Sequence, residues 1–414
     1  MNQETRSGPT MHDTGQGPLA GLSVVEIAST IAGPVCARLL ADFGADVVKI
    51  EPLDGDPVRQ MGRHVDDVSL YAATILRGKR SLAVDLKSPQ GREIAFALCS
   101  RADIVVENNR PGVMERLGLG YAALSEANPG LVMVRISGYG QDGPYAQRPG
   151  YGAICEAVGG VRHMTGDPDR PPARVALATT DYLTAVYAAF GAMMAIHART
   201  RTGRGQVVDT ALYETAFTQM ESYVPAFEKQ GFIPQREGPN LPTMAPNSLY
   251  PSRDGPWVLI AANNKATFER LVTLMGQPEL LEDPRFESIR SRGQKPNMRA
   301  LDEIIGQWSR QYDAADLEAM LLAAEVPSSR VYTIADIYAD PHYAARGMLK
   351  RVPHDTLGHT TQVGVVPRLS ATPGDVRRSG PDIGADSASV LTSLGYGEDA
   401  IGRLRDEGVI RALR

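Results

Sequence analysis

The chain of 414 residues has few cysteines, and their spacing excludes two kinds of site. Cys36, Cys99 and Cys155 lie far apart and have no neighbouring cysteine or histidine at metal-ligand spacing. This pattern argues against a disulfide framework and against a zinc site, so we expect no metal. We interpret the three thiols as small buried apolar side chains.

The chain also lacks a basic excess and a long apolar run. It carries 43 Lys and Arg against 48 Asp and Glu, a net charge of −5, which gives no indication of a nucleic-acid partner. Its longest apolar run, residues 186–196, is well short of the ~20 residues that cross a bilayer, so we expect a buried helix and no membrane partner. Residues 1–18 have neither a basic cluster nor an apolar core. We therefore expect a disordered tail, no signal peptide and a cytoplasmic location.

Common catalytic motifs are missing as well. The sequence has no G-x-S-x-G, H-E-x-x-H, Walker or protein-kinase motif, which leaves hydrolase, metalloprotease and phosphoryl-transfer functions without support. Residues 138–143, GYGQDG, match G-x-G-x-x-G after an expected strand, but PYAQRPGYG follows and opposes the helix that a dinucleotide site needs. We interpret this segment as a loop that lets a ligand approach the backbone, or as an ordinary turn.

Alternating strand and helix patterns predict an α/β fold. The expected strands are followed by amphipathic segments, as in βαβ units, which indicates an open parallel, Rossmann-like sheet with helices on both faces. A ligand is then expected at the carboxyl ends of the strands. The expected strands are 22–29, 45–51, 81–86, 103–108 and 131–137, and the expected helices between them include 35–43 and 88–102.

A second, smaller α+β domain is expected where the pattern changes, near Arg253. One strand and three amphipathic helices follow that point, and the chain then returns to Gly and Pro punctuation and a helix at 387–395. We therefore divide the chain into a tail at 1–18, a large domain at 19–225 completed by 341–414, and a linker with a small domain at 226–340.

Two groups of side chains are candidates for chemistry. Several basic residues lie near expected strand ends, where together they could bind a phosphorylated ligand, although each alone is more typical of a solvated surface. They are Arg77, Lys79, Arg80, Lys87, Arg110 and Arg116. The second candidate is Asp181, which precedes apolar residues at helical spacing.

Asp181 has two interpretations. Asp is a preferred helix N-cap, which contributes ~1 kcal/mol, and the pattern alone favours that role. A carboxylate at a helix N-terminus is also held ionised and oriented, which suits a nucleophile.

A series of segments in one order carries a family resemblance from about Leu19 to the C-terminus. It includes GLSVVEIASTIAGPVCARLLADFGADVVKIE, LRGKRSLAVDLKSPQGR, DIVVENNRPGVMERLGLGY, NPGLVMVRISGYGQDGPY, and the D-x-x-T at Asp181 with RTRTGRGQVVD after it. Together these segments resemble the family III CoA-transferases, which include formyl-CoA transferase and carnitine CoA-transferase. The resemblance implies a large CoA-binding domain and an interlocked homodimer.

The resemblance also implies a mechanism in which CoA moves from an acyl-CoA donor, such as succinyl-CoA, to a free carboxylic acid. Asp181 is then the catalytic residue: it attacks the donor thioester, passes through a mixed anhydride and carries CoA as an aspartyl-CoA thioester. No tightly bound cofactor is implied, because coenzyme A and acyl-CoA are substrates. The apolar helix after Asp181 is expected to shield these intermediates from water.

Further site residues follow from the resemblance. The implied CoA contacts are Thr30, Ala32, Val84, Lys87, Arg116 and Leu117. The implied substrate-lining residues are Ile31, Gly138, Tyr151 and His163, and Arg162, His163 and Arg174 are candidates for binding a substrate carboxylate.

Three departures from the family pattern bear on specificity. Ile31 stands where some members have Gln, Gly152 follows Tyr151 where several have an acidic residue, and a Gly-rich shielding loop is absent from residues 238–248. These departures argue against oxalate and formyl specificity.

Two alternatives stay open. One is an isomerase like α-methylacyl-CoA racemase, which shares the fold and uses a His and an Asp. Its His position falls on Tyr151, whose phenol is a poor base at neutral pH, although His163 could substitute. The other is a non-catalytic acyl-CoA-binding protein in which Asp181 only caps its helix.

Overall fold

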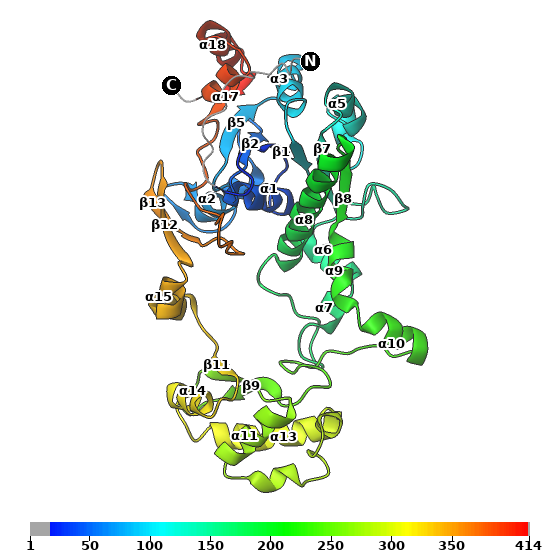
Figure 1. The fold of residues 1–414 in the computed structure, drawn as a ribbon, viewed down its shortest axis with the longest axis vertical. Coiled ribbons are helices and arrows are strands. Elements are labelled where there is room, and N and C mark those ends of the chain that lie inside the picture. Colours follow the sequence, from blue (N-terminus) through cyan, green and yellow to red (C-terminus); the bar gives the residue numbers. More distant parts are fainter. Residues whose placement is uncertain (1–16, 413–414) are drawn as a thin grey trace. The chain divides into compact units, whose positions relative to one another are not determined.

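The computed structural model describes residues 17–412, so the tail expected at 1–18 lies almost wholly outside the described residues. The chain divides into two compact units. The first unit contains the residues up to 161, residues 175–224 and the residues from 342 onward. The second contains residues 162–174 and 225–341. Figure 1 shows both units coloured along the sequence.

The first unit is built on a seven-stranded sheet in the order β14-β5-β2-β1-β6-β7-β8. The six strands from β5 to β8 pair in parallel, which confirms the expected open parallel sheet, and β14 adds an antiparallel edge next to β5. The strands are β1 (Ser23–Ile27), β2 (Asp46–Glu51), β5 (Arg80–Val84), β6 (Ile104–Glu107), β7 (Val132–Ser137), β8 (Val207–Ala211) and β14 (Ile410–Arg411).

Helices cover both faces of this sheet, as expected (Figure 1). Successive strand residues point to opposite faces. Val24 therefore packs in the core beneath α1 (Ala32–Asp42) and α8 (Thr179–Thr202), whereas Val25 packs on the face covered by α3 (Pro89–Cys99) and α17 (Ser387–Ser393). The helix α18 (Glu398–Asp406), which follows α17, adds Ile401 and Leu404 to the second face.

Shorter elements complete the first unit. Two small antiparallel pairs join β3 to β4 and β12 to β13. The chain passes between the two units four times: within α7, between residues 174 and 175, within α10 and within α16. These elements are β3 (His64–Val65), β4 (Val68–Ser69), β12 (Leu349–His354), β13 (Gly358–Val363), α2 (Leu70–Ile75), α4 (Val113–Arg116), α5 (Tyr121–Ala127), α6 (Gly152–Val158), α7 (Val161–Met164), α9 (Leu212–Phe217), α10 (Tyr223–Gln230) and α16 (Pro341–Ala345).

The second unit has its own core around a three-stranded antiparallel sheet in the order β11-β10-β9. Phe268, Leu301 and Trp308 pack in that core. The strand and three helices expected after Arg253 are β10, α11, α13 and α14. The elements are β9 (Asn247–Pro251), β10 (Trp257–Ala261), β11 (Ser328–Arg330), α11 (Lys265–Leu274), α12 (Ile289–Arg292), α13 (Lys295–Ser309), α14 (Ala314–Ala323) and α15 (Ile334–Ala339).

The helix α8 buries a different face from the one expected. Its buried residues are small, among them Thr184, Ala188 and Ala192, and they let α8 pack closely on α1 and the sheet. The large apolar residues point outward: Val186 is 52% exposed and Phe190 59% exposed. The helix expected to be buried is therefore buried on one face only, and its large apolar residues lie on the other.

One compositional expectation can be checked on the described residues. All three cysteines are buried and free, as interpreted from their spacing. Within residues 17–412, no helix has both the length and the apolar character needed to cross a bilayer. The same residues contain no group of His, Cys, Asp and Glu side chains placed to hold a metal ion.

Candidate active site

A cavity of about 320 Å³ opens beside Asp181 at the carboxyl ends of the central strands. It brings together seven of the residues singled out from the sequence: Thr30, Ile31, Ala32, Arg110, Gly138, Tyr151 and Asp181. Further lining residues include Ser29, Asn108, Arg148 and Leu212. The position agrees with the rule that ligands of an open α/β sheet bind beyond the strand ends.

Asp181 is not the N-cap of its helix. The N-cap of α8 is Ala178, and Asp181 follows in the first turn, half-buried at the cavity wall. The N-cap interpretation is therefore wrong. A carboxylate in the first turn still benefits from the helix dipole, while its oxygens can face the cavity.

Gly152 lies directly against the Asp181 carboxylate. A Cβ added at Gly152 would lie 2.0 Å from Asp181 Oδ2 and 2.8 Å from Cγ. No other residue type fits there without moving the carboxylate, because a real Cβ contact is essentially never below 3.0 Å. The absence of a side chain at this first residue of α6 therefore leaves the space that the carboxylate occupies.

The loop between β1 and α1 forms another wall, in a conformation that side chains rarely adopt. Thr30 has φ = 70°, in the left-handed region that is costly for a β-branched residue. Its N–H donates to Asp56 Oδ1 over 3.0 Å. The neighbouring Ser29 donates its N–H to Asn108 Oδ1 over 2.8 Å and accepts from Asn108 Nδ2 over 2.8 Å.

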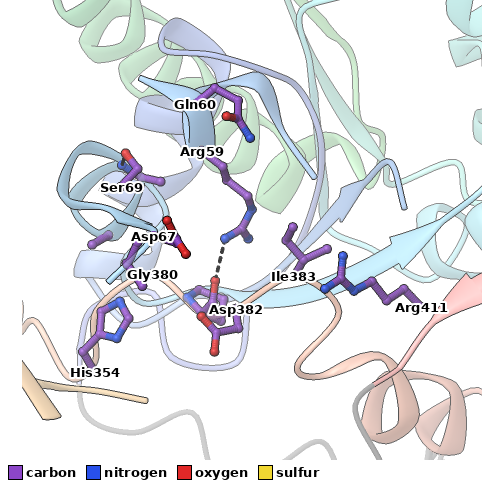
Figure 2. A pocket seen from close by; sticks show the side chains of 13 residues that line it. Arg59, Gln60, Asp67, Ser69, His354, Gly380, Asp382, Ile383 and Arg411 are labelled. Atoms are coloured by element: carbon purple, nitrogen blue, oxygen red, sulfur yellow. Dashed lines mark hydrogen bonds between the residues drawn. The ribbon is translucent and has the colours of Figure 1, made fainter. Parts of the chain in front are cut away.

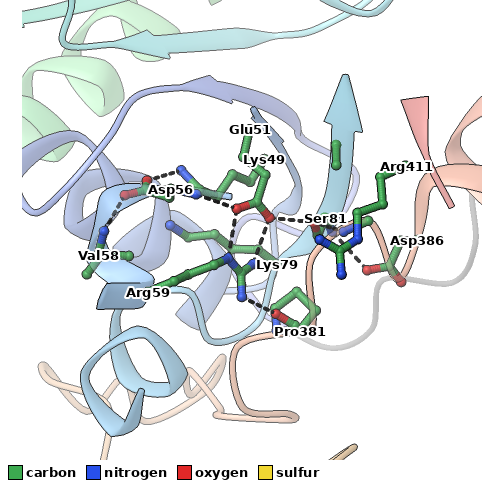
Figure 3. Close-up of polar contacts among 12 residues, drawn as sticks. Lys49, Glu51, Asp56, Val58, Arg59, Lys79, Ser81, Pro381, Asp386 and Arg411 are labelled. Atoms are coloured by element: carbon green, nitrogen blue, oxygen red, sulfur yellow. Dashed lines mark hydrogen bonds and ion pairs between the residues drawn. The ribbon is translucent and has the colours of Figure 1, made fainter. Parts of the chain in front are cut away.

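Asp56 is itself held by buried ion pairs beneath the loop (Figure 3). Lys49 Nζ lies 2.7 Å from Asp56 Oδ2 and 2.7 Å from Glu26 Oε1, and it donates to the Ala28 carbonyl. Although burial alone lowers the pKa of Lys49, the carboxylates of Glu26 and Asp56 raise it overall. Lys49 therefore stays charged and fixes Asp56, which in turn fixes the Thr30 loop.

Lys79 shares Glu26 with Lys49. Its Nζ donates to Glu26 Oε2 over 2.5 Å and to the Pro34 carbonyl over 2.7 Å. Burial lowers the pKa of Lys79 to about 8, and the positive charge of Lys49 adds to that effect against the attraction of Glu26. The lysine serves the interior of the fold and does not reach a ligand.

The basic group proposed from the sequence therefore separates into two kinds. Arg77 donates to Asp42 over 2.8 Å and Arg80 pairs with Asp46 over 2.5 Å, so both, like Lys79, are neutralised within the fold. They do not form the expected anion site. Lys87 remains exposed, and Arg110 and Arg116 are exposed as well.

A second cavity, of about 590 Å³, lies beyond the ends of β1, β2 and β5. Val84 and Lys87 line it, and it shares Ser29, Pro57 and Asn109 with the cavity beside Asp181. A long substrate could therefore extend from Lys87 to Asp181. Of the other residues implied as CoA contacts, Arg116 and Leu117 line neither cavity. Arg116 is the last residue of α4 and is exposed, and Leu117 follows it.

A third cavity, of about 270 Å³, is lined by Arg59 and His354, whose side chains bond to other groups of the protein (Figure 2). Arg59 donates to both Glu51 oxygens, at 2.8 and 2.7 Å, and to the Pro381 carbonyl at 2.9 Å. His354 Nδ1 accepts N–H groups from Thr356 and Leu357.

His163, Arg162 and Arg174 are not among the residues that line the Asp181 cavity. All three belong to residues 162–174 of the second unit. His163 is exposed, and its Nε2 lies 3.1 Å from the Pro234 carbonyl.

Comparison with known proteins identifies the family. The family model of CoA-transferase family III matches residues 19–387. The chain belongs to this family. It is 44% identical over 396 residues to the succinyl-CoA–D-citramalate CoA-transferase of Chloroflexus aurantiacus, covering 95% of this chain and 98% of that protein.

Two further relatives agree with this assignment. The succinyl-CoA:mesaconate CoA-transferase of Haloarcula hispanica is 38% identical, over 81% of this chain and 86% of its own length. A crystal structure of a CAIB/BAIF family protein from Brucella suis superposes with a TM-score of 0.81 at 34% identity, covering 92% of this chain and all of that one. The protein is therefore a CoA-transferase, an enzyme that moves CoA from an acyl-CoA to a carboxylic acid.

Several residues of this site were not found from the sequence. Asp56 and Asn108 shape the Thr30 loop through contacts 26 and 79 positions away, and a single sequence carries no signal for such pairs. Arg148 lies in the Gly- and Pro-rich stretch after residues 138–143, where only its charge would have drawn attention.

Proposed function

We propose that this family III CoA-transferase takes CoA from succinyl-CoA and passes it to a small carboxylic acid through a thioester on Asp181. The observation that carries the proposal is the Asp181 carboxylate itself, half-buried at the wall of a cavity that adjoins a larger one lined by Lys87. Succinyl-CoA is chosen because the relatives from Chloroflexus and Haloarcula are named for it.

The reaction divides into two half-reactions that use the same carboxylate. Asp181 attacks the carbonyl carbon of succinyl-CoA, the C–S bond breaks, and a mixed anhydride and CoA thiolate form. The thiolate then attacks the aspartyl carbonyl, which releases succinate and leaves Asp181 as a CoA thioester. The acceptor carboxylate attacks this thioester in the same way, and the returning thiolate forms the new CoA ester and frees Asp181. A carboxylate is ionised at pH 7, so no step needs a separate general base.

The two adjoining cavities suit the two ends of CoA. Lys87, exposed beside Val84 in the larger cavity, can pair with a phosphate group. Thr30 and Ala32 in the smaller cavity then contact the thioester end, next to Asp181. Ile31, Gly138 and Tyr151 line the space left for the acyl group, with Tyr151 73% exposed.

Trapping the intermediate tests this proposal. Incubation of the enzyme with succinyl-CoA and hydroxylamine is expected to convert Asp181 to its hydroxamate, which peptide mass spectrometry locates. Asp181→Asn should abolish both the modification and the transfer of CoA. Asp399→Asn is a matched control, because Asp399 also lies in the first turn of a helix, α18, but is exposed and lines no cavity near Asp181. CoA transfer that survives in Asp181→Asn would refute the mechanism.

The racemase alternative needs a second proton-transfer group opposite Asp181. No histidine is among the described residues that line its cavity, and Tyr151 occupies the position where the racemase has one. We therefore favour transfer. Deuterium uptake at the α-carbon of a branched acyl-CoA, without transfer to a free acid, would favour the racemase instead.

The exposed apolar face of α8 supports the homodimer implied by the family resemblance. Val186, Phe190 and Met194 are spaced four residues apart and are each at least 50% exposed, so they form one stripe on the helix. A contiguous apolar stripe of this kind is typical of an interaction surface. We propose that a second copy of the chain covers it. Sedimentation velocity should show a dimer for the wild type and a monomer for Phe190→Glu.

A further inference from the structure

Two arginines line the Asp181 cavity. Among the described lining residues, Arg110 and Arg148 are the cationic side chains and Asp181 is the carboxylate. Arg110 belongs to the loop after β6, and Arg148 to the segment after β7. Both side chains are exposed.

The two arginines differ from Arg77, Arg80 and Arg135 because no carboxylate of the described residues neutralises them, and they differ from the exposed Arg101 and Arg116 because they line the Asp181 cavity. Arg77 and Arg80 pair with Asp42 and Asp46, and Arg135 pairs with Glu107 over 2.8 Å. Within residues 17–412, no carboxylate lies within ion-pair distance of Arg110 or Arg148. Arg148 instead lies over the ring of Tyr145, with its guanidinium carbon 3.4 Å from the ring centre.

The chemistry of transfer calls for a positive charge at this place. Succinyl-CoA carries one free carboxylate besides its thioester, and a dicarboxylic acceptor carries one besides the carboxylate that reacts. Either charge must be brought close to the ionised Asp181 in a cavity where the acyl intermediates have to be kept from water. A guanidinium can hold such a carboxylate by two parallel N–H···O bonds and offset the repulsion.

We infer that Arg110 and Arg148 bind the second, non-reacting carboxylate of a dicarboxylic substrate and thereby set the preference for dicarboxylic over monocarboxylic acids. This inference rests on the proposed function and specifies the substrate class of the same site. Because donor and acceptor occupy the cavity in turn, the same pair of arginines serves both half-reactions. Arg162, His163 and Arg174, the candidates from the sequence for binding a substrate carboxylate, do not line this cavity.

Two acceptor acids of matched shape distinguish recognition of the second carboxylate from a general effect on the transfer of CoA. Succinate and butyrate have the same chain length, but butyrate carries a methyl group in place of the second carboxylate. With succinyl-CoA as donor, the incorporation of labelled succinate and the formation of butyryl-CoA each give a kcat/KM for the acceptor. In a mechanism with a covalent enzyme intermediate, this parameter reports only the half-reaction with the acceptor, so donor binding does not enter.

Arg110→Gln and Arg148→Gln should each lower kcat/KM for succinate by about 10-fold or more, the range for a lost charge-assisted hydrogen bond. Each should change kcat/KM for butyrate by less than about 3-fold. Arg110→Lys should recover part of the preference for succinate, because it keeps the charge without the two-pronged geometry. Arg101→Gln, an exposed arginine after α3 that lines neither cavity, should leave both values unchanged.

The ratio of the two kcat/KM values within one variant is independent of how much of that variant is folded. An equal loss with both acids, or no loss with either, in an enzyme whose wild type transfers CoA would overturn the inference. A wild type that transfers CoA from succinyl-CoA to neither acid would count against the proposed function itself, and the two failures are thus distinguishable.

Discussion

Replacing Gly152 with alanine tests whether the position of the Asp181 carboxylate controls the reaction. The added Cβ would lie 2.0 Å from Oδ2, and the two atoms must move apart by about 1 Å to reach the 3.0 Å that such contacts require. The carboxylate is the far end of a short side chain anchored in the first turn of α8, so it moves more readily than the backbone of α6.

A misplacement of about 1 Å at a reacting group can lower a rate about 100-fold. We therefore expect Gly152→Ala to lower kcat/KM for CoA transfer about 100-fold, which corresponds to about 3 kcal/mol of transition-state stabilisation. Hydroxylamine trapping at Asp181 should slow in parallel, because the first attack on the donor thioester needs the same geometry.

The matched control is Gly402→Ala in α18. Gly402 has a helical backbone and no atom within 4 Å of an added Cβ. Alanine there should leave activity unchanged and raise the unfolding free energy by roughly 0.5–1 kcal/mol, since alanine is the better helix former. A Gly152→Ala enzyme that is folded by circular dichroism and keeps more than about a third of wild-type kcat/KM would refute the reasoning.

Three further predictions concern the surroundings of the site and are measured by denaturant unfolding. Asp56→Ala removes the carboxylate that pairs with Lys49 and accepts from the Thr30 N–H. It should lower the unfolding free energy by about 3 kcal/mol or more and raise KM for succinyl-CoA. An unchanged KM would contradict the role given to the Thr30 loop. Thr30→Gly should raise the unfolding free energy by about 1 kcal/mol, because glycine adopts φ = 70° without strain, and a lower value would show that the threonine side chain contributes more than its conformation costs. Burial raises the pKa of the Cys99 thiol from 9.0 to about 12, so the unfolded chain loses this proton at lower pH than the folded one, and the unfolding free energy falls as pH rises above 9. Between pH 8 and 10, that fall should be about 1 kcal/mol smaller in Cys99→Ala than in the wild type. Equal falls in the two proteins would contradict the burial of the thiol.

The sheet could be predicted from the sequence because its strands are short β-branched runs with helices between them. Residues 45–51 and 131–137 read as strands and became β2 and β7. The strands that were not predicted have weaker patterns: β8 contains Asp209, and β14 is two residues long and pairs with β5 from the far end of the chain. Pairing partners that are distant in sequence leave no periodic signal in a single chain.

The face that α8 buries could not be predicted, because the helix has two apolar faces. Tyr187 and Phe190 on one side are more hydrophobic than Ala188 and Ala192 on the other, so a rule based on hydrophobicity selects the wrong side. The structure buries the alanines because α8 crosses α1 and the sheet, where small side chains allow a close approach. The larger residues lie on the opposite face of α8, which no other part of the described chain covers.

The sequence alone also does not distinguish charged residues that pair within the fold from charged residues that are available to a ligand. Arg77 and Arg110 look alike in the sequence, since each lies close to an expected strand end. Asp42 neutralises Arg77, and burial of an unpaired guanidinium there would be strongly unfavourable, so Arg77 has no capacity left for a substrate. Arg110 faces a cavity with Asp181 and has no partner carboxylate among the described residues, so its charge is balanced when an anion enters. Two structural properties, the lack of a partner carboxylate within the described chain and a position in the Asp181 cavity, together support the proposal that Arg110 and Arg148 bind the dicarboxylic substrate.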